Sequence, residues 1–330
     1  MFFHPSTILF VFFLFFSLIM SICMNSWFLI WFFIEMNLLS FIPLILLKKN
    51  KYSVESSLKY FFIQTLSSIL ILIALILLFT KFDMYNILFI SGLSIKLGLA
   101  PFHQWMVNIV EGLVWPLMGV LLTIQKVGPF ILFCYIYNIK DNLIYLMYLI
   151  SLLCSFFGCL GGLFTNSLRK ILVFSSISHA SWMILALMSS ISLWSLYFSL
   201  YMMILFSVLY ILNSFYLTNL NHMFLKLNFF ISFSLGISLL SLGGMPPLTG
   251  FVPKFIMMKE LLMNYNFFIL LFLLLGVFIS LFFYSRLFMF NFIFLSYKNL
   301  FLKYSKSKIN YILYINMMGF VMIPLIMYMY

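Results

Sequence analysis

Apolar residues run along this chain in long stretches that short polar connections separate. A membrane-spanning helix needs about 20 consecutive, mostly apolar residues. Inside a bilayer the backbone polar groups must be satisfied internally, which helices and closed barrels achieve. We therefore predict an all-α, polytopic membrane protein with about eleven transmembrane helices. The predicted spans are 5–24, 27–47, 58–80, 84–109, 113–137, 143–164, 168–188, 193–217, 227–262, 267–295 and 311–329.

Glycine and proline interrupt two of these spans. The fourth contains the motif LSIKLGLAPFHQW, in which Gly98 and Pro101 break an apolar run. The ninth is too long for one straight crossing and contains GGMPPLTGFVPK, with Pro246 and Pro247 at its centre. Non-helical backbone at membrane depth is tolerated only where protein buries it or where it lines a cavity. We expect each of these segments to form two half-helices around a break.

The order of the spans indicates two related halves. If spans 1–5 and 6–10 are grouped, the interrupted span is the fourth of each group. An odd number of spans per group inverts the second group relative to the first, and matching interruptions in two such halves are typical of a transport site. We predict a first inverted five-helix repeat over 1–140, a second over 141–296, and a loop with a C-terminal transmembrane helix over 297–330.

Charged residues are scarce and unevenly distributed. They form 7% of the chain, against about 25% in soluble proteins, and the mean hydropathy is +1.20. The net charge of +12 comes from short connections, so we expect no nucleic-acid partner. Connections after spans 2, 6, 8 and 10 carry eleven basic residues, and the others carry three. The positive-inside rule then predicts the N-terminus and the 296–310 loop on the cytoplasmic or matrix side, with the C-terminus opposite.

A few ionisable side chains fall deep within the predicted spans. A charge at the bilayer centre costs roughly 2.5–3.5 kcal/mol, so an intramembrane charge is functional by default. Near one another, such groups hold each other's charge, and moving a proton on one changes the proton affinity of the next. This is the equipment of a proton relay that needs no cofactor. The candidates are Glu35, Lys96, Lys126 and Lys254, with His103 and His179 as weaker ones.

Each candidate also has a simpler interpretation. Lys96 could snorkel to the interface from a poorly defined helix end. Glu35 and Lys126 could each belong to a static ion pair that only fixes packing. His179 is equally well explained as a satisfied interior hydrogen-bonding residue. The four cysteines show no metal-ligand spacing, and the chain has no glycine-rich nucleotide loop, so we expect any linked redox reaction to occur elsewhere.

Six motifs together resemble one family. In chain order they are WFFIEMNLLSFIPL, VESSLKYF, SIKLGLAPFHQW, TIQKVGPF, LRKILVFSSISHASWM and SLGGMPPLTGFVPKF. They resemble the chain 2 family of antiporter-like subunits in mitochondrial NADH:ubiquinone oxidoreductase (respiratory complex I), whose wider family includes the Mrp-type antiporter subunits. The eleven spans are similar to the shortened animal form of that chain. One position departs from the family pattern: Val107 stands where a proline usually follows the tryptophan of the first break.

The resemblance implies a role for each charged candidate. Glu35 would pair with Lys96 in a first half-channel, Lys126 would link the half-channels, and Lys254 would serve the second. The chain would be a core subunit of an H⁺-translocating NADH:ubiquinone reductase in the mitochondrial inner membrane, with its N-terminus on the matrix side and its C-terminus on the intermembrane-space side. Its proton translocation would be coupled to electron transfer in other subunits.

The resemblance also implies cofactors and partners. FMN, iron–sulfur clusters and ubiquinone would be bound by other subunits, with no cofactor or metal bound by this chain. Its partners would be other complex I membrane subunits, including a neighbouring antiporter-like chain, accessory subunits, and phospholipids such as cardiolipin. Two alternatives stay open: a stand-alone Mrp-type cation/proton antiporter subunit, and a structural spacer with a vestigial relay.

Overall fold

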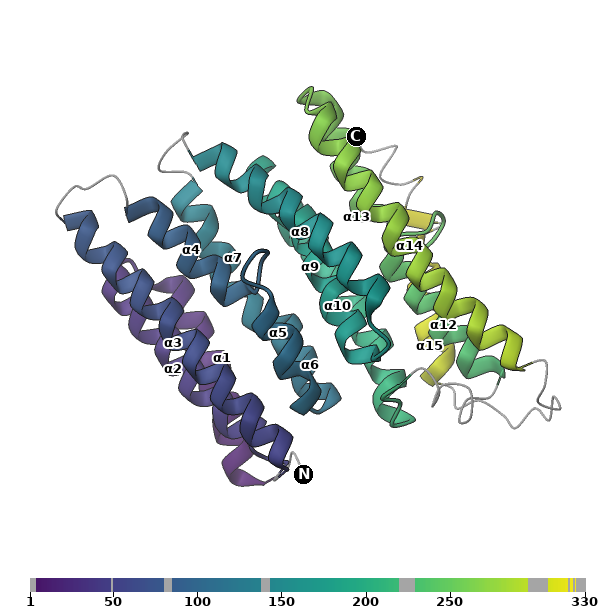
Figure 1. Ribbon diagram of the computed structural model, residues 1–330, viewed down its shortest axis with the longest axis horizontal. Coiled ribbons are helices and arrows are strands. Elements are labelled where there is room, and N and C mark those ends of the chain that lie inside the picture. The colour runs from purple at the N-terminus through teal and green to yellow at the C-terminus, as the bar shows by residue number, and fades with distance from the viewer. Residues whose placement is uncertain are drawn as a thin grey trace. The chain divides into compact units, whose positions relative to one another are not determined.

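The regular secondary structure of the described residues is almost entirely helical (Figure 1). The computed structural model describes residues 4–48, 50–79, 85–137, 143–219, 229–295, 308–319, 321–322 and 324. Within these ranges the β-structure amounts to an isolated bridge between Ser167 and Asn219. The prediction of an all-α membrane protein is confirmed. The chain divides into two compact units, 1–150 and 151–330.

The helices of the first unit close into a ring. Helix α1 packs on α2, α2 on α3, α3 on α4, α4 on α7, and α7 on α1. The ring surrounds an interior that receives side chains from every member. Its elements are α1 (Pro5–Cys23), α2 (Trp27–Ile45), α3 (Lys51–Phe79), α4 (Tyr85–Leu97), α5 (Gln104–Ile109), the 3₁₀ turn η1 (Val110–Gly112), α6 (Trp115–Leu122) and α7 (Ile124–Tyr137).

Helices of the second unit also pack in a ring, and the second interrupted span contributes α12 to it. Helix α9 packs on α10, α10 on α12, α12 on α14, and α14 on α9, while α13 packs on α9, α10 and α14. Helix α15 packs on α10 and α12. The elements are α8 (Ile144–Phe164), which begins in the first unit, α9 (Leu168–Ser189), α10 (Ile191–Ser214), α12 (Phe229–Gly243), α13 (Phe251–Met263), α14 (Phe267–Leu295) and α15 (Lys308–Met317).

The outer surface of both units is apolar, as expected for a protein in lipid. Along α14, for example, one stripe of large apolar side chains is exposed at helical spacing. It comprises Phe268, Leu271, Leu275, Phe278 and Phe282. Buried serines and tyrosines lie among the buried apolar side chains in the interior of the second unit. The polar groups of the spans are therefore found inside the helix rings.

Eight described segments are long and apolar enough to cross a membrane. They are α1, α2, α3, α6 together with α7, α8, α9, α10 and α14. Two shorter apolar helices, α4 and most of α12, form the first halves of the interrupted spans. The count of eleven spans stays a prediction, because part of the last predicted span lies outside the described residues.

Two of the predicted spans correspond to candidate spans in the structure but differ from them in detail. Helix α3 begins at Lys51, earlier than the predicted start at Leu58, and the Ser53 hydroxyl accepts a hydrogen bond from the Asn50 backbone N–H at 3.1 Å at its new first turn. The fifth span is not one continuous helix, because Thr123 has φ −120° and ψ −79° and separates α6 from α7. The Thr123 hydroxyl donates to the carbonyl oxygen of Gly119 at 2.7 Å. Such side-chain bonds compete with the helical pattern.

Candidate functional site

The first break begins with a glycine-capped helix end. Gly98 has a φ of +66°, a conformation that favours glycine because other residues place Cβ badly there. Its N–H donates to the Ile95 carbonyl at 3.1 Å, and the N–H of Leu99 donates to the Ser94 carbonyl at 3.0 Å. This bond pattern is the Schellman motif, which satisfies carbonyls that a helix end would leave open. The Ala100–Pro101 peptide that follows is cis.

Helix α5 returns the chain to the end of α4. The Trp105 indole Nε1–H donates to the Ile95 carbonyl at 2.9 Å, so the broken span is bridged from within. His103 is the N-cap residue of α5. Val107 lies inside α5, where a valine retains the backbone N–H that a proline would lack.

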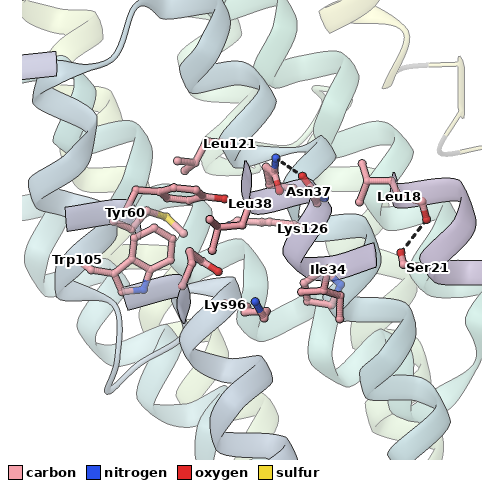
Figure 2. Close-up of a pocket in the computed structure, with 14 residues that line it drawn as sticks. Leu18, Ser21, Ile34, Asn37, Leu38, Tyr60, Lys96, Trp105, Leu121 and Lys126 are labelled. Carbon is pink, nitrogen blue, oxygen red and sulfur yellow. Dashed lines mark hydrogen bonds between the residues drawn. The ribbon is translucent and has the colours of Figure 1, made fainter. Parts of the chain in front are cut away.

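Lys96 and Lys126 line the same cavity in the first unit (Figure 2). Lys96 lies in the last turn of α4, and Lys126 lies in the first helical turn of α7. The cavity has a volume of about 40 Å³. That is room for roughly three water molecules at 10–15 Å³ each. The other lining residues are Leu18, Ser21, Ile34, Asn37, Leu38, Tyr60, Gln64, Trp105, Met106, Leu121, Gln125 and Pro129.

Uncharged polar side chains frame this cavity, and the sequence reasoning missed them. The Gln125 side-chain N–H donates to Asn37 Oδ1 at 2.9 Å and joins α7 to α2, as the dashed line in Figure 2 shows. Tyr60 and Gln64 reach the cavity from α3. Buried amides in otherwise apolar spans are costly unless they are hydrogen-bonded. Asn37 and Gln64 could therefore have been recognised as interior residues.

The backbone around Lys126 is interrupted on both sides. The Lys126 N–H donates to the Thr123 carbonyl at 2.9 Å, a bond over three residues rather than four. Pro129 lacks the N–H that would bond to the Gln125 carbonyl in a regular helix. Both irregularities lie beside a lysine that is only 3% exposed. Carbonyls freed in this way can bond to water in the cavity.

Glu35 lies near this site but outside the cavity lining. It interacts electrostatically with Lys96 and with Tyr60. Its Oε1 is buried and has no hydrogen-bond partner in the part of the chain that the structure describes. In that part, Glu35 and Lys96 form no contact at ion-pair distance. The structure thus shows the two side chains apart.

The second break repeats the plan of the first. Gly244 has a φ of +83°, and the Pro246–Pro247 peptide is cis. The Gly244 N–H donates to the Ser241 carbonyl at 3.0 Å, and the N–H of Met245 donates to the Leu240 carbonyl at 3.3 Å. Helix α12 therefore also ends in a Schellman motif. In both breaks the capping glycine precedes the cis proline by three residues.

Lys254 is tethered to the helix end that precedes it. It lies in the first turn of α13, yet its Nζ donates to the Gly243 carbonyl at 2.6 Å. A cation is stabilised at the C-terminal end of a helix, where the partial charge is negative. Gly244 makes room for the tether, since a Cβ at this position would lie 2.8 Å from Lys254 Nζ.

His179 shares a small cavity with Lys254. The cavity measures about 10 Å³, roughly enough for one water molecule. His179 Nε2 lies 3.0 Å from the Leu242 carbonyl, and Nδ1 lies 2.9 Å from the Tyr197 hydroxyl. Because a carbonyl only accepts, Nε2 carries a proton, and when the ring is neutral Nδ1 accepts from Tyr197. The other lining residues are Ser155, Cys159, Ser178, Trp182, Leu273, Gly276, Val277 and Ser280.

The structure therefore groups four of the six predicted site residues into two pairs. Lys96 and Lys126 share one cavity, and His179 and Lys254 share the other. His103 lines neither of these two cavities. Among the described residues, no three His, Cys, Asp or Glu side chains gather into a group that could hold a metal ion.

Sequence comparisons identify similar proteins over most of this chain. Residues 24–280 match the family model described as NADH:quinone oxidoreductase/Mrp antiporter, TM. The chain is 39% identical to NADH-ubiquinone oxidoreductase chain 2 of Anopheles gambiae, over 91% of this chain and 87% of that protein. It is 33% identical to NADH-ubiquinone oxidoreductase chain 2 of Mus musculus, over 86% of each.

Solved structures show the same fold at low sequence identity. A chain of respiratory complex I from Thermus thermophilus is 18% identical, with a TM-score of 0.76 over 97% of this chain and 77% of that one. A chain of the archaeal membrane-bound sulfane sulfur reductase is 17% identical, with a TM-score of 0.81 over 96% and 73%. A chain of the Mrp complex from Dietzia is 15% identical, with a TM-score of 0.75 over 84% and 59%. These likenesses show the fold alone.

Proposed function

The chain belongs to the NADH:quinone oxidoreductase/Mrp antiporter family, and from this membership we propose that it is a core proton-translocating membrane subunit of respiratory complex I. Other subunits carry electrons from NADH to ubiquinone, and this chain moves protons across the membrane in response. The identity to chain 2 relatives over most of both chains favours this function over a stand-alone Mrp-type cation/proton antiporter subunit.

The observation that carries the proposal is the cavity that Lys96 and Lys126 share. A protonated lysine donates to water, a neutral lysine accepts from it, and about three waters are enough to bridge two such groups. Two positive charges at one cavity disfavour each other, so loading one lysine promotes release from the other. The site can thus transfer a proton between the first break and the start of α7.

Glu35 supplies a switch for the first lysine in this proposal. At an effective dielectric near 20, a carboxylate and an ammonium about 4 Å apart attract by roughly 4 kcal/mol. Closing a Glu35–Lys96 pair would stabilise the charged form of the lysine, and the separated arrangement seen here removes that stabilisation. The break after Leu97 gives α4 a point at which it can adjust.

Lys254 and His179 continue the pathway in the second unit. Both reach the end of α12, one through the Gly243 carbonyl and the other through the Leu242 carbonyl. Release of Lys254 from its carbonyl would free its ammonium to give a proton to the small cavity beside it. His179 is fully hydrogen-bonded while neutral, so it acts either as a relay member or as a fixed anchor of this helix end.

Redox groups and partners complete the proposal. FMN, iron–sulfur clusters and ubiquinone are bound by other complex I subunits, while this chain contacts a neighbouring antiporter-like chain, accessory subunits and phospholipids such as cardiolipin. The membrane is the mitochondrial inner membrane, with the N-terminus on the matrix side and the C-terminus on the intermembrane-space side. The unequal distribution of basic residues among the connections supports this orientation.

A protease test checks the orientation. Protease added from the matrix side should cleave the 296–310 loop, most of which lies outside the described residues. Cleavage only from the other side would reverse the orientation.

The decisive experiment replaces the shared-cavity lysine. Lys126→Met should leave the complex assembled while the protons moved per NADH oxidised fall strongly, because the acceptor of the first half is lost. The matched control is Lys59→Met, which changes an exposed lysine paired with Glu55. Normal proton translocation in assembled Lys126→Met would favour a spacer with a vestigial relay. A wild-type chain that purifies outside any large assembly would favour the stand-alone antiporter.

A further inference from the structure

Helix α15 inserts a buried asparagine into the second break. Asn316 has no exposed surface. Its Oδ1 accepts from the Ser241 hydroxyl at 2.8 Å, and its Nδ2 donates to the Ser207 hydroxyl at 3.3 Å and to the Ile312 carbonyl at 2.9 Å. Its backbone carbonyl accepts from the Thr249 N–H at 3.1 Å. One residue of a C-terminal helix thus bonds to α10, to α12 and to the connection before α13.

Gly319 brings the same helical turn into contact with the backbone of the break. A Cβ at this position would lie 2.4 Å from the Leu248 carbonyl carbon and 2.6 Å from both the Pro247 oxygen and the Thr249 nitrogen. Real Cβ atoms do not approach backbone so closely, so only glycine fits without a shift of one segment. Gly319 follows the end of α15 by two residues, and both it and Asn316 contact the segment from Pro247 to Thr249.

The bonds of Asn316 reach both sides of the break. Ser241 belongs to the Schellman end of α12, two residues before the carbonyl that holds Lys254. Thr249 directly precedes Gly250, the N-cap residue of the helix that carries Lys254. The 2.6 Å bond between Lys254 and Gly243 depends on the relative placement of these two helix ends.

We propose that Asn316 and Gly319 form a clamp that fixes the second break, with Asn316 acting as a positioning residue for Lys254. The clamp explains why a costly amide lies in a segment otherwise suited to lipid. It also gives the C-terminal helix a role inside the second unit. Its effect on proton translocation rests on the proposed function, whereas its effect on the break does not.

The test compares variants in the assembled complex by hydrogen–deuterium exchange. Asn316→Leu removes three side-chain hydrogen bonds and should speed amide exchange across residues 244–250 by at least roughly five- to tenfold, the effect of about one buried hydrogen bond. Exchange across 98–103, at the first break, should stay unchanged. The matched control is Met318→Leu, at an exposed position of the same helical turn. Ser241→Ala, which removes the same bond by deleting one hydroxyl, should act similarly and serves if Asn316→Leu fails to assemble.

A functional readout separates positioning from a merely structural role. Asn316→Leu should lower the protons moved per NADH oxidised and shift the pH profile of that ratio, while NADH oxidation by an artificial acceptor stays normal. Asn316→Asp, which keeps an oxygen for Ser241, should recover part of both exchange protection and coupling. Adding Ser241→Ala to Asn316→Leu should change little, since Asn316→Leu already removes the bond that joins the two side chains.

Three results would overturn the clamp. The first is exchange at 244–250 that matches the Met318→Leu control in both Asn316→Leu and Ser241→Ala. The second is faster exchange in Asn316→Leu without any change in the protons moved per NADH oxidised, provided that Lys254→Met does lower that number. The third is full additivity of the double variant. If exchange at 244–250 rises in Asn316→Leu but no lysine variant alters the protons moved per NADH oxidised, the proposed function is wrong. The proposal that Asn316 fixes the backbone of the second break then still holds.

Discussion

The two breaks use one backbone design to hold their lysines in opposite ways. Each begins with a glycine at positive φ that closes a Schellman motif and ends with a cis proline three residues later. Lys96 precedes its break and makes no hydrogen bond or ion pair within the residues that the structure describes. Lys254 follows its break and is bonded to the carbonyl of Gly243. A shared helix-end geometry therefore does not dictate whether the nearby cation is tethered.

The surroundings of Lys96 leave it more freedom than those of Lys254. Lys96 faces a cavity of about 40 Å³ and has a carboxylate, Glu35, close enough to interact electrostatically. Lys254 faces a cavity of about 10 Å³ that it shares with His179. The first break has the room and the acidic partner for a lysine that moves, whereas the second holds its lysine in a packed site. The two breaks therefore differ in how much freedom each leaves its lysine.

The largest expected effect comes from glycine replacements that test how tightly each break is packed. In Gly250→Ala the new Cβ would lie 1.6 Å from the Ser241 carbonyl oxygen, so two helix ends must separate. We expect a loss of at least about 3 kcal/mol and little assembled complex on a native gel. In Gly98→Ala the nearest atom is the flexible end of Met106, and the left-handed backbone costs about 1–2 kcal/mol. Equal loss of assembly in both variants would show that the two breaks are packed equally tightly.

An intermediate effect is expected from replacing each lysine by methionine. Lys254→Met loses a charge-assisted hydrogen bond and should lower the stability of the assembled complex by about 1.5–3 kcal/mol. Lys96→Met loses no bond and should unfold at nearly the wild-type temperature. Both variants should translocate fewer protons per NADH oxidised. Thermal unfolding and proton translocation measured on the same preparations check this. A Lys96→Met complex that is less stable than the Lys254→Met complex would contradict the conclusion that Lys254 is held by a hydrogen bond and Lys96 is not.

The smallest effect on stability is expected from Glu35→Gln, which tests the proposed switch at Lys96 directly. The carboxylate has no partner within the described residues at its buried Oε1, so the amide should cost less than about 1 kcal/mol. Proton translocation should nevertheless fall, because an amide cannot hold Lys96 charged. The measurements are the yield of assembled complex and the protons moved per NADH oxidised. Blocked assembly, or translocation at the wild-type level, would exclude a switching role for Glu35.

The helices and the two main breaks were predictable because their causes are local. Twenty apolar residues make a helix in lipid, and Gly98 with Pro101 or Gly244 with Pro246 ends one, whatever surrounds it. The break at Thr123 was missed because neither glycine nor proline occurs there, and a threonine is compatible with a helix until its hydroxyl finds a carbonyl. The start of α3 was missed because its charged first turns read as a loop.

The partners of the site residues were not predictable, since they depend on which helices meet. Gln125 bonds to Asn37 across 88 residues, and Ser241 bonds to Asn316 across 75. An amide within an apolar span can be predicted from the sequence to lie in the interior. Its hydrogen-bond partner depends on how the helices pack. The same limit applies to Glu35: the family resemblance implies a pairing with Lys96, but the separation of the two side chains depends on how their helices pack.

The end of α12 also carries a thermodynamic consequence. Its last two carbonyls, those of Leu242 and Gly243, accept hydrogen bonds from His179 and from Lys254. Two titratable groups thus draw on one negative helix pole. By linkage, whatever factor the charge on His179 imposes on the proton affinity of Lys254, the charge on Lys254 must impose on His179. This reciprocity requires that His179 itself gain and lose a proton, whereas a histidine that stays neutral only fixes the end of α12.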